Sequence, residues 1–246
     1  MRWIYLSPHL DDAVLSAGGL IRHQVSAGIP VEIWTFMCGF PPAGELSLFA
    51  QALHQLWGFQ SAEQAIQGRR VEDQKAAARL GAGTMHFDFL DCIYRRDPGG
   101  NWLYPEEVCV PPRPEDVELP GQIAEAISMR LLPDDVLVCQ FAIGRHVDHT
   151  LVRRAAELLG RPLWYAADVP YVFNNLEELA PNTDGLELTA HALSETDLQA
   201  WPEAVLAYGS QLSGLFESDE AMRLALAGYA GDKRGISLWR APADWA

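Results

Sequence analysis

Two patterns of hydrophobic and polar positions alternate along the first two thirds of the chain. Short apolar runs rich in β-branched and aromatic residues are typical of buried strands, and they predict strands at 3–7, 31–37, 84–89, 135–139 and 163–167. Between them, apolar residues recur every three or four positions, as on one face of a helix. This spacing predicts helices at 12–27, 61–80, 115–132 and 149–159.

Strands that alternate with helices indicate an α/β protein with a doubly wound (Rossmann-like), mostly parallel sheet flanked by helices. Two stretches interrupt the alternation, 38–60 and 90–114, and both are rich in Pro, Gly and aromatic residues. We expect them to form long loops at the carboxyl edge of the sheet, where they would build the walls of an active site.

The order of elements is less definite beyond residue 168. The pattern there predicts a strand at 185–193, a helix at 194–211, a short helix at 218–227 and a final strand at 235–240. No stretch has the composition of a linker between domains. We therefore expect a single domain spanning residues 1–246.

Composition narrows the classes of partner and compartment. The net charge is −15, from 33 acidic and 18 basic side chains, which argues against a nucleic acid or an anionic membrane as the main partner. No apolar run approaches the ~18 residues that cross a bilayer, and the N-terminus lacks the pattern of a secretory signal. The four cysteines form no C-x-x-C pair and predict reduced thiols in a cytoplasmic protein. Nothing in the composition excludes a homo-oligomer.

The candidate chemistry lies in the turns that follow the first and fourth strands. The first turn carries His9, Asp11 and Asp12, and the second leads into the run His146-Val147-Asp148-His149. In an open parallel sheet, ligands bind at such turns, and the common strand order makes these two strands neighbours. One of the two adjacent aspartates could instead only cap the following helix.

Three of these residues suit a catalytic metal, which needs three protein ligands and one open position. His9 and Asp12, three residues apart, can supply two ligands, and His149 can supply the third if the two strands are adjacent. A set of two imidazoles and one carboxylate suits Zn²⁺, although other divalent transition metals such as iron or manganese also fit.

The same two stretches resemble the signatures of a known family. Residues 7–13 are similar to the Ala/Ser-His-Pro-Asp-Asp-Glu motif of the PIG-L/LmbE-like family of zinc-dependent N-acetylglucosamine (GlcNAc) deacetylases, and 146–149 are similar to its His-x-Asp-His motif. The sequence departs from the family pattern at Leu10, where proline is usual, and at Ala13, where glutamate is usual. The likeness runs through most of the chain.

The resemblance implies a role for each matching residue. Asp11 would be the general base for an attacking water, and His146, if protonated, would stabilise the oxyanion and protonate the leaving amine. His9, Asp12 and His149 would bind the metal. Asp148 would orient His146 or His149 from behind.

Two further positions match the family less specifically. Arg69 lies in a helix motif whose arginine faces the substrate, but it could equally form a surface ion pair with Glu72 or Asp73. Asp91 matches a position that binds a sugar hydroxyl, but it could also be an ordinary turn aspartate.

The resemblance implies a metal-dependent hydrolase that removes an N-acetyl group from a small-molecule amino sugar or its conjugate and releases acetate and a free amine. The alternative is a non-catalytic, metal-containing carbohydrate- or metabolite-binding protein of the same fold, because Ala13 removes a carboxylate that could order the site. A nucleotide-binding protein is disfavoured because no Gly-x-Gly-x-x-Gly follows the first strand.

Overall fold

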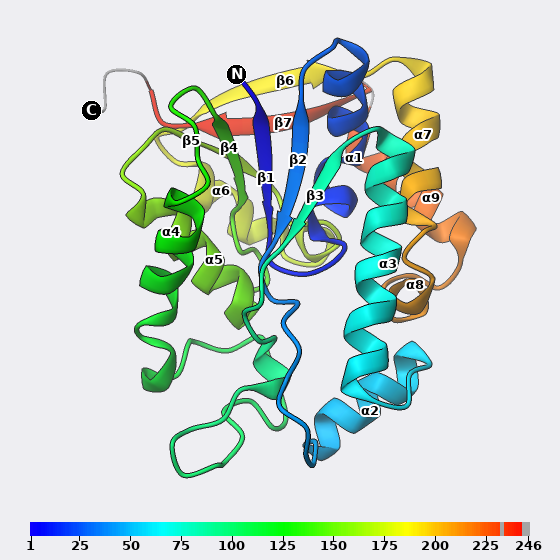
Figure 1. The fold of residues 1–246 in the computed structure, drawn as a ribbon. Helices are drawn as coiled ribbons and strands as arrows, with labels where there is room; N and C mark the ends of the chain where they lie inside the picture. Colours follow the sequence, from blue (N-terminus) through cyan, green and yellow to red (C-terminus); the bar gives the residue numbers. More distant parts are fainter. Residues whose placement is uncertain (232–233, 243–246) are drawn as a thin grey trace.

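A seven-stranded sheet forms the centre of the molecule (Figure 1). The computed structural model describes residues 1–231 and 234–242. The strands lie in the order β3-β2-β1-β4-β5-β7-β6. The first five are parallel, and β7 runs antiparallel to both of its neighbours, β5 and β6. Their bounds are β1 (Trp3–Ser7), β2 (Val31–Thr35), β3 (Gly83–His86), β4 (Val136–Gln140), β5 (Leu163–Ala166), β6 (Glu187–Ala192) and β7 (Gly235–Arg240). The predicted doubly wound, mostly parallel α/β fold is confirmed.

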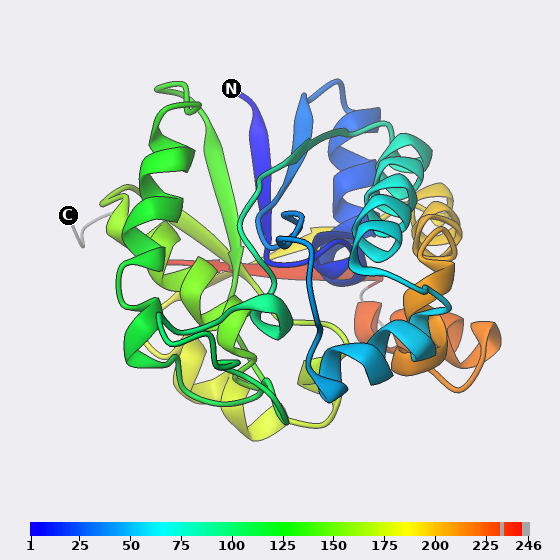
Figure 2. The ribbon, with the colours of Figure 1, turned by 60° about the horizontal axis from the view of Figure 1, so that its bottom comes forward.

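Helices cover both faces of this sheet (Figures 1 and 2). Their bounds are α1 (Asp12–Ser26), α2 (Leu48–Trp57), α3 (Ala62–Leu80), α4 (Leu119–Ser128), α5 (Val147–Leu158), α6 (Leu179–Thr183), α7 (Glu195–Val205), α8 (Gly209–Leu215) and α9 (Asp219–Ala230). The β1 side chains alternate between two cores: Tyr5 packs toward α1 and α7, and Ile4 and Leu6 pack toward α4 and α5. Within the described ranges, no helix is long and apolar enough to cross a membrane.

Three predicted elements have different bounds in the structure. The helix expected at 115–132 occupies only 119–128, because proline fits the first turn of a helix and Pro120 therefore marks its start. The strand expected at 84–89 ends at His86, beyond which the chain passes close to Gly39. The segment 38–60, expected to form a long loop, contains the helix α2.

The helix expected at 194–211 is two helices, α7 and α8, and the break has a tertiary cause. At the break, the Tyr208 hydroxyl donates a hydrogen bond to Asp73 (2.8 Å), and in the first turn of α8 the Ser210 N–H donates one to Glu72 (2.8 Å). Both acceptors lie on α3. The contacts with α3 hold the chain in a turn at this point, although the helical spacing of the sequence continues through it.

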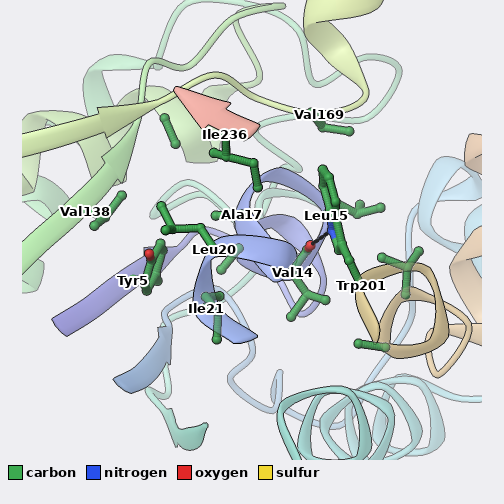
Figure 3. Close-up of a cluster of buried hydrophobic side chains, with 14 of the residues drawn as sticks. Tyr5, Val14, Leu15, Ala17, Leu20, Ile21, Val138, Val169, Trp201 and Ile236 are labelled. Atoms are coloured by element: carbon green, nitrogen blue, oxygen red, sulfur yellow. Dashed lines mark hydrogen bonds between the residues drawn. The ribbon is translucent and has the colours of Figure 1, made fainter. Parts of the chain in front are cut away.

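Two adjacent glycines let α7 pack closely against α1 (Figure 3). The Trp201 indole of α7 donates a hydrogen bond to the carbonyl of Val14 (2.7 Å) and lies over the backbone of α1. A Cβ at Gly18 would overlap the Trp201 ring, and one at Gly19 would come within 2.6 Å of Leu193. Glycine at 18 and 19 lowers the helix propensity of α1, but it leaves the space that the close contact with α7 requires.

We expect Gly18→Ala to lower the free energy of unfolding by about 1–3 kcal/mol, because the added methyl group overpacks the contact with Trp201. Gly121→Ala in α4 is the matched control. Its Cβ would meet no atom within 4 Å, so that change should raise stability by about 0.5–1 kcal/mol. Urea denaturation of both variants measures the difference, and equal effects of the two substitutions would contradict this account.

Candidate active site

Adjacent strands bring the two histidine motifs together. β1 pairs with β4, and their carboxyl ends lead into the turns before α1 and α5. The centroid of the His9 ring lies 4.7 Å from that of the His146 ring and 5.4 Å from that of the His149 ring. The predicted meeting of the two turns is therefore present in the structure, at the sheet edge that comes forward in Figure 2.

A cavity of about 220 Å³ opens at this edge. α2 and α8 supply part of its wall, so the predicted wall segment 38–60 does border the site. Of the predicted site residues, six line the cavity: His9, Asp11, Asp12, Arg69, Asp91 and His146. His149 and Asp148 are buried next to these residues.

His149 presents an unused nitrogen to Asp12. Its Nδ1 lies 2.9 Å from Oδ1 of the fully buried Asp168, which fixes the proton of the neutral ring on Nδ1. Its Nε2 is buried, makes no hydrogen bond within the described chain, and lies 3.4 Å from Oδ1 of Asp12. A buried lone pair held in place by a carboxylate behind the ring is the usual arrangement of a metal-binding histidine.

His9 is held in the same way. Its Nε2 lies 3.0 Å from Oδ2 of Asp148, so the lone pair of the neutral ring is on Nδ1, 3.3 Å from Oδ2 of Asp12. The predicted contact of Asp148 with His146 is made by its backbone N–H, which donates to Nδ1 (3.2 Å), and not by its carboxylate. The Asp148 carboxylate instead contacts His9 and the Arg95 guanidinium (2.6 Å) because the turn before α5 faces β1.

The charges around these three side chains favour a cation. Burial opposes protonation of His149, but Asp12 and Asp168 outweigh it and raise the pKa of His149 to about 9. Burial also opposes protonation of His9, and contacts with Asp12 and Asp148 raise its pKa well above the usual value. Two imidazoles, one of which has an orphaned buried nitrogen, and one carboxylate thus fit a divalent metal ion, whose charge would take the place of these protons.

Asp11 is free to act on a ligand. It occupies the position before α1, but its side chain makes no capping hydrogen bond. Its nearest cation is the Arg69 guanidinium, 3.9 Å from Oδ2. Burial and the neighbouring Asp12 raise the pKa of Asp11 to about 6, against the opposing effect of Arg69. The alternative that Asp11 only caps the helix is not supported.

Arg69 makes neither of the two surface ion pairs that the sequence left open. Glu72 instead binds Ser210, and Asp73 binds Tyr208. The Arg69 guanidinium lies over the Trp57 ring, 4.7 Å from its centroid, and lines the cavity.

His146 presents an N–H to the cavity. Its Nδ1 accepts a hydrogen bond from the backbone N–H of Asp148 (3.2 Å), so the proton of the neutral ring is on Nε2. Burial, together with the nearby His9 and His149, lowers the pKa of His146 well below its usual value. A neutral ring with Nε2–H is a hydrogen-bond donor, which distinguishes His146 from the two histidines that present lone pairs.

Asp91 is a turn aspartate that also borders the cavity. Its Oδ1 accepts the backbone N–H of Ile93 (3.1 Å) at the start of a 3₁₀ turn, and its Oδ2 lies 3.8 Å from Nε2 of His9. The residue also lines the cavity. It is a turn aspartate placed where a ligand can reach it.

The sequence did not point to Asp168, which contacts His149, or to Arg95, which contacts Asp148 behind His9. Asp168 follows the end of β5 by two residues, as His9 follows the end of β1 by two residues. This position at the carboxyl end of a parallel strand could have marked Asp168 as a site residue. Arg95 lies in the irregular segment 90–114 and carries no local signal.

The chain belongs to the PIG-L family. The family model described as GlcNAc-PI de-N-acetylase matches residues 4–159, which include both histidine motifs. The predicted family is confirmed, and with it hydrolytic N-deacetylation as the class of reaction.

Relatives cover almost the whole chain. The 2'-N-acetylparomamine deacetylase of Niallia circulans is 28% identical in an alignment of 242 residues that covers 90% of this chain and 85% of that protein. The zinc-inhibited form of teicoplanin deacetylase Orf2 is 27% identical with a TM-score of 0.88 over 100% of both chains. The A40926 pseudoaglycone deacetylase Dbv21 is 31% identical with a TM-score of 0.78, covering 97% of this chain and 96% of that one.

Proposed function

We propose that this protein is a zinc-dependent deacetylase that hydrolyses the N-acetyl group of an amino sugar carried on a larger conjugate. The observation that supports it most is the orphaned Nε2 of His149 beside Asp12 and His9, next to the free carboxylate of Asp11. The named relatives are deacetylases of 2'-N-acetylparomamine, teicoplanin and the A40926 pseudoaglycone, which supports an amino-sugar conjugate as substrate.

His9, Asp12 and His149 would hold the ion. When bound, such an ion polarises an acyl carbonyl and makes water more acidic. Asp11 accepts the proton of the water that attacks the amide carbon. The Nε2–H of His146 donates a hydrogen bond to the carbonyl oxygen as it gains negative charge.

The lowered pKa of His146 changes one predicted role. A neutral imidazole can donate a hydrogen bond, but it is a poor source of a proton for the leaving amine. We assign that proton to Asp11, which gained it from the water. The C–N bond then breaks as the nitrogen takes the proton, leaving a free amine and acetic acid, which ionises to acetate by releasing its proton to water.

The departure at Ala13 does not favour the non-catalytic alternative. Ala13 is buried in the apolar core, where a glutamate side chain would need polar partners. Asp148 orders His9 from behind and Asp168 orders His149, so the site has carboxylates for this purpose without a glutamate at position 13.

The test is acetate release from N-acetylglucosamine, 2'-N-acetylparomamine and an acetylated glycopeptide. We expect turnover of at least one of them. Dialysis against a chelator should abolish it, and stoichiometric Zn²⁺ should restore it. Metal-loaded protein that binds these compounds without releasing acetate would instead establish the binding-protein alternative.

A further inference from the structure

α8 places a buried carboxamide on the wall of the candidate active site. Gln211 is 6% exposed and lines the same cavity as His9, Asp11 and Arg69. It lies outside residues 4–159, the part matched by the family model, and belongs to no motif. α8 sits beside α2 and the lower half of α3 in both ribbon views (Figures 1 and 2).

A chain of hydrogen bonds fixes the orientation of this carboxamide. The Glu72 carboxylate accepts the Ser210 hydroxyl proton at 2.6 Å and the Ser210 N–H at 2.8 Å. Since Ser210 has given its only hydroxyl proton to Glu72, its oxygen can only accept from Gln211, 2.8 Å away. The amide atom at that position is therefore Nε2, and the carbonyl Oε1 points elsewhere.

Oε1 of Gln211 is left with unused hydrogen-bonding capacity. No group of residues 1–231 or 234–242 donates a hydrogen bond to it. Oε1 is not among the fully enclosed polar atoms of the described residues, so a ligand in the cavity can reach it and supply the missing donor. An oriented but unpartnered acceptor in a cavity is therefore a specific sign of ligand binding.

Arg69 offers the complementary donors in the same cavity. The residue is only 5% exposed. Its Nε has no hydrogen-bond partner among the described residues. A sugar hydroxyl donates one hydrogen bond and accepts others, so neighbouring hydroxyls on a pyranose ring can satisfy an acceptor and a guanidinium together. An apolar ligand group would leave both unsatisfied.

We propose that Gln211 is a substrate-binding residue whose Oε1 accepts a hydrogen bond from a hydroxyl of the amino-sugar ring, with Arg69 donating to oxygens of the same ring. Glu72 and Ser210 are positioning residues that aim the carboxamide. This inference rests on the proposed function, because it assumes that the cavity holds an amino sugar.

The test compares wild type with Gln211→Met, which keeps the length of the side chain and removes its polar atoms. The probes are N-acetylglucosamine and its 3-, 4- and 6-deoxy analogues, with acetate release measured for each. We expect the substitution to lower kcat/KM about 10-fold on the parent sugar, mainly through KM, as loss of one ligand hydrogen bond predicts. On one deoxy analogue it should cause no further loss. Gln199→Met, at an exposed position of α7, is the matched control and should change neither.

Other outcomes decide against the inference. If Gln211→Met lowers kcat/KM equally on the parent sugar and all three deoxy analogues, or on none of them, the contact with a hydroxyl is overturned. If Gln211→Met fails to fold, Ser210→Ala keeps the carboxamide but frees its orientation, and unchanged kcat/KM in that variant would also overturn the proposal. If wild type releases no acetate from any acetylated amino sugar, the proposed function fails first and takes this inference with it.

Discussion

Asp11→Asn is expected to lower kcat by about 10²–10⁴-fold while the protein keeps its metal, because this is the range that a positioned general base contributes. The amide has nearly the same shape as the carboxylate but cannot accept the proton of the attacking water. Asp11 makes no capping hydrogen bond, so its replacement should leave the turn before α1 intact. The candidate ligands His9, Asp12 and His149 are untouched by this change.

Steady-state acetate release and metal content by mass spectrometry measure the two effects separately. Asp134→Asn, an exposed aspartate in the turn before β4, is the matched control and should match wild type in both. Wild-type turnover in Asp11→Asn would remove Asp11 as the base. Loss of metal in that variant would show instead that Asp11 is a ligand.

The order of the elements and the place of the site were predictable because they depend on local patterns. The run at 3–7 and the helical spacing after it define a strand–turn–helix unit without reference to the rest of the chain. The neighbouring positions of β1 and β4 follow from the common strand order of such sheets, which is why His9 and His149 could be placed together.

The details that the sequence could not supply all depend on partners far apart in the chain. Asp148 was expected to serve a histidine of its own motif, yet it contacts His9, 139 residues away. The break before α8 exists because Glu72 and Asp73 bind residues more than 130 positions later. Gln211 becomes visible as a ligand-binding candidate only once that break places it at the cavity, since no periodicity or motif marks it.

His149→Ala is expected to abolish metal binding and reduce acetate release to the background rate. The variant loses the unused Nε2 and leaves only His9 and Asp12 as candidate ligands, fewer than the three protein ligands of a catalytic zinc.

Asp168→Asn should have a graded effect, weakening metal affinity about 10–100-fold, because it alters the group that fixes the His149 ring without removing the ligand.

Competition with a chelating dye gives the metal affinity of each variant, and circular dichroism checks that each is folded. His23→Ala is the matched control, since His23 lies on the same helix as Asp12 but pairs with Asp197 away from the cavity. A His149→Ala protein that binds zinc as tightly as wild type would refute this ligand set. Loss of metal in His146→Ala but not in His149→Ala would point to the other histidine of the motif, because the nitrogens of His9, His146 and His149 all lie within 4.8 Å of one another.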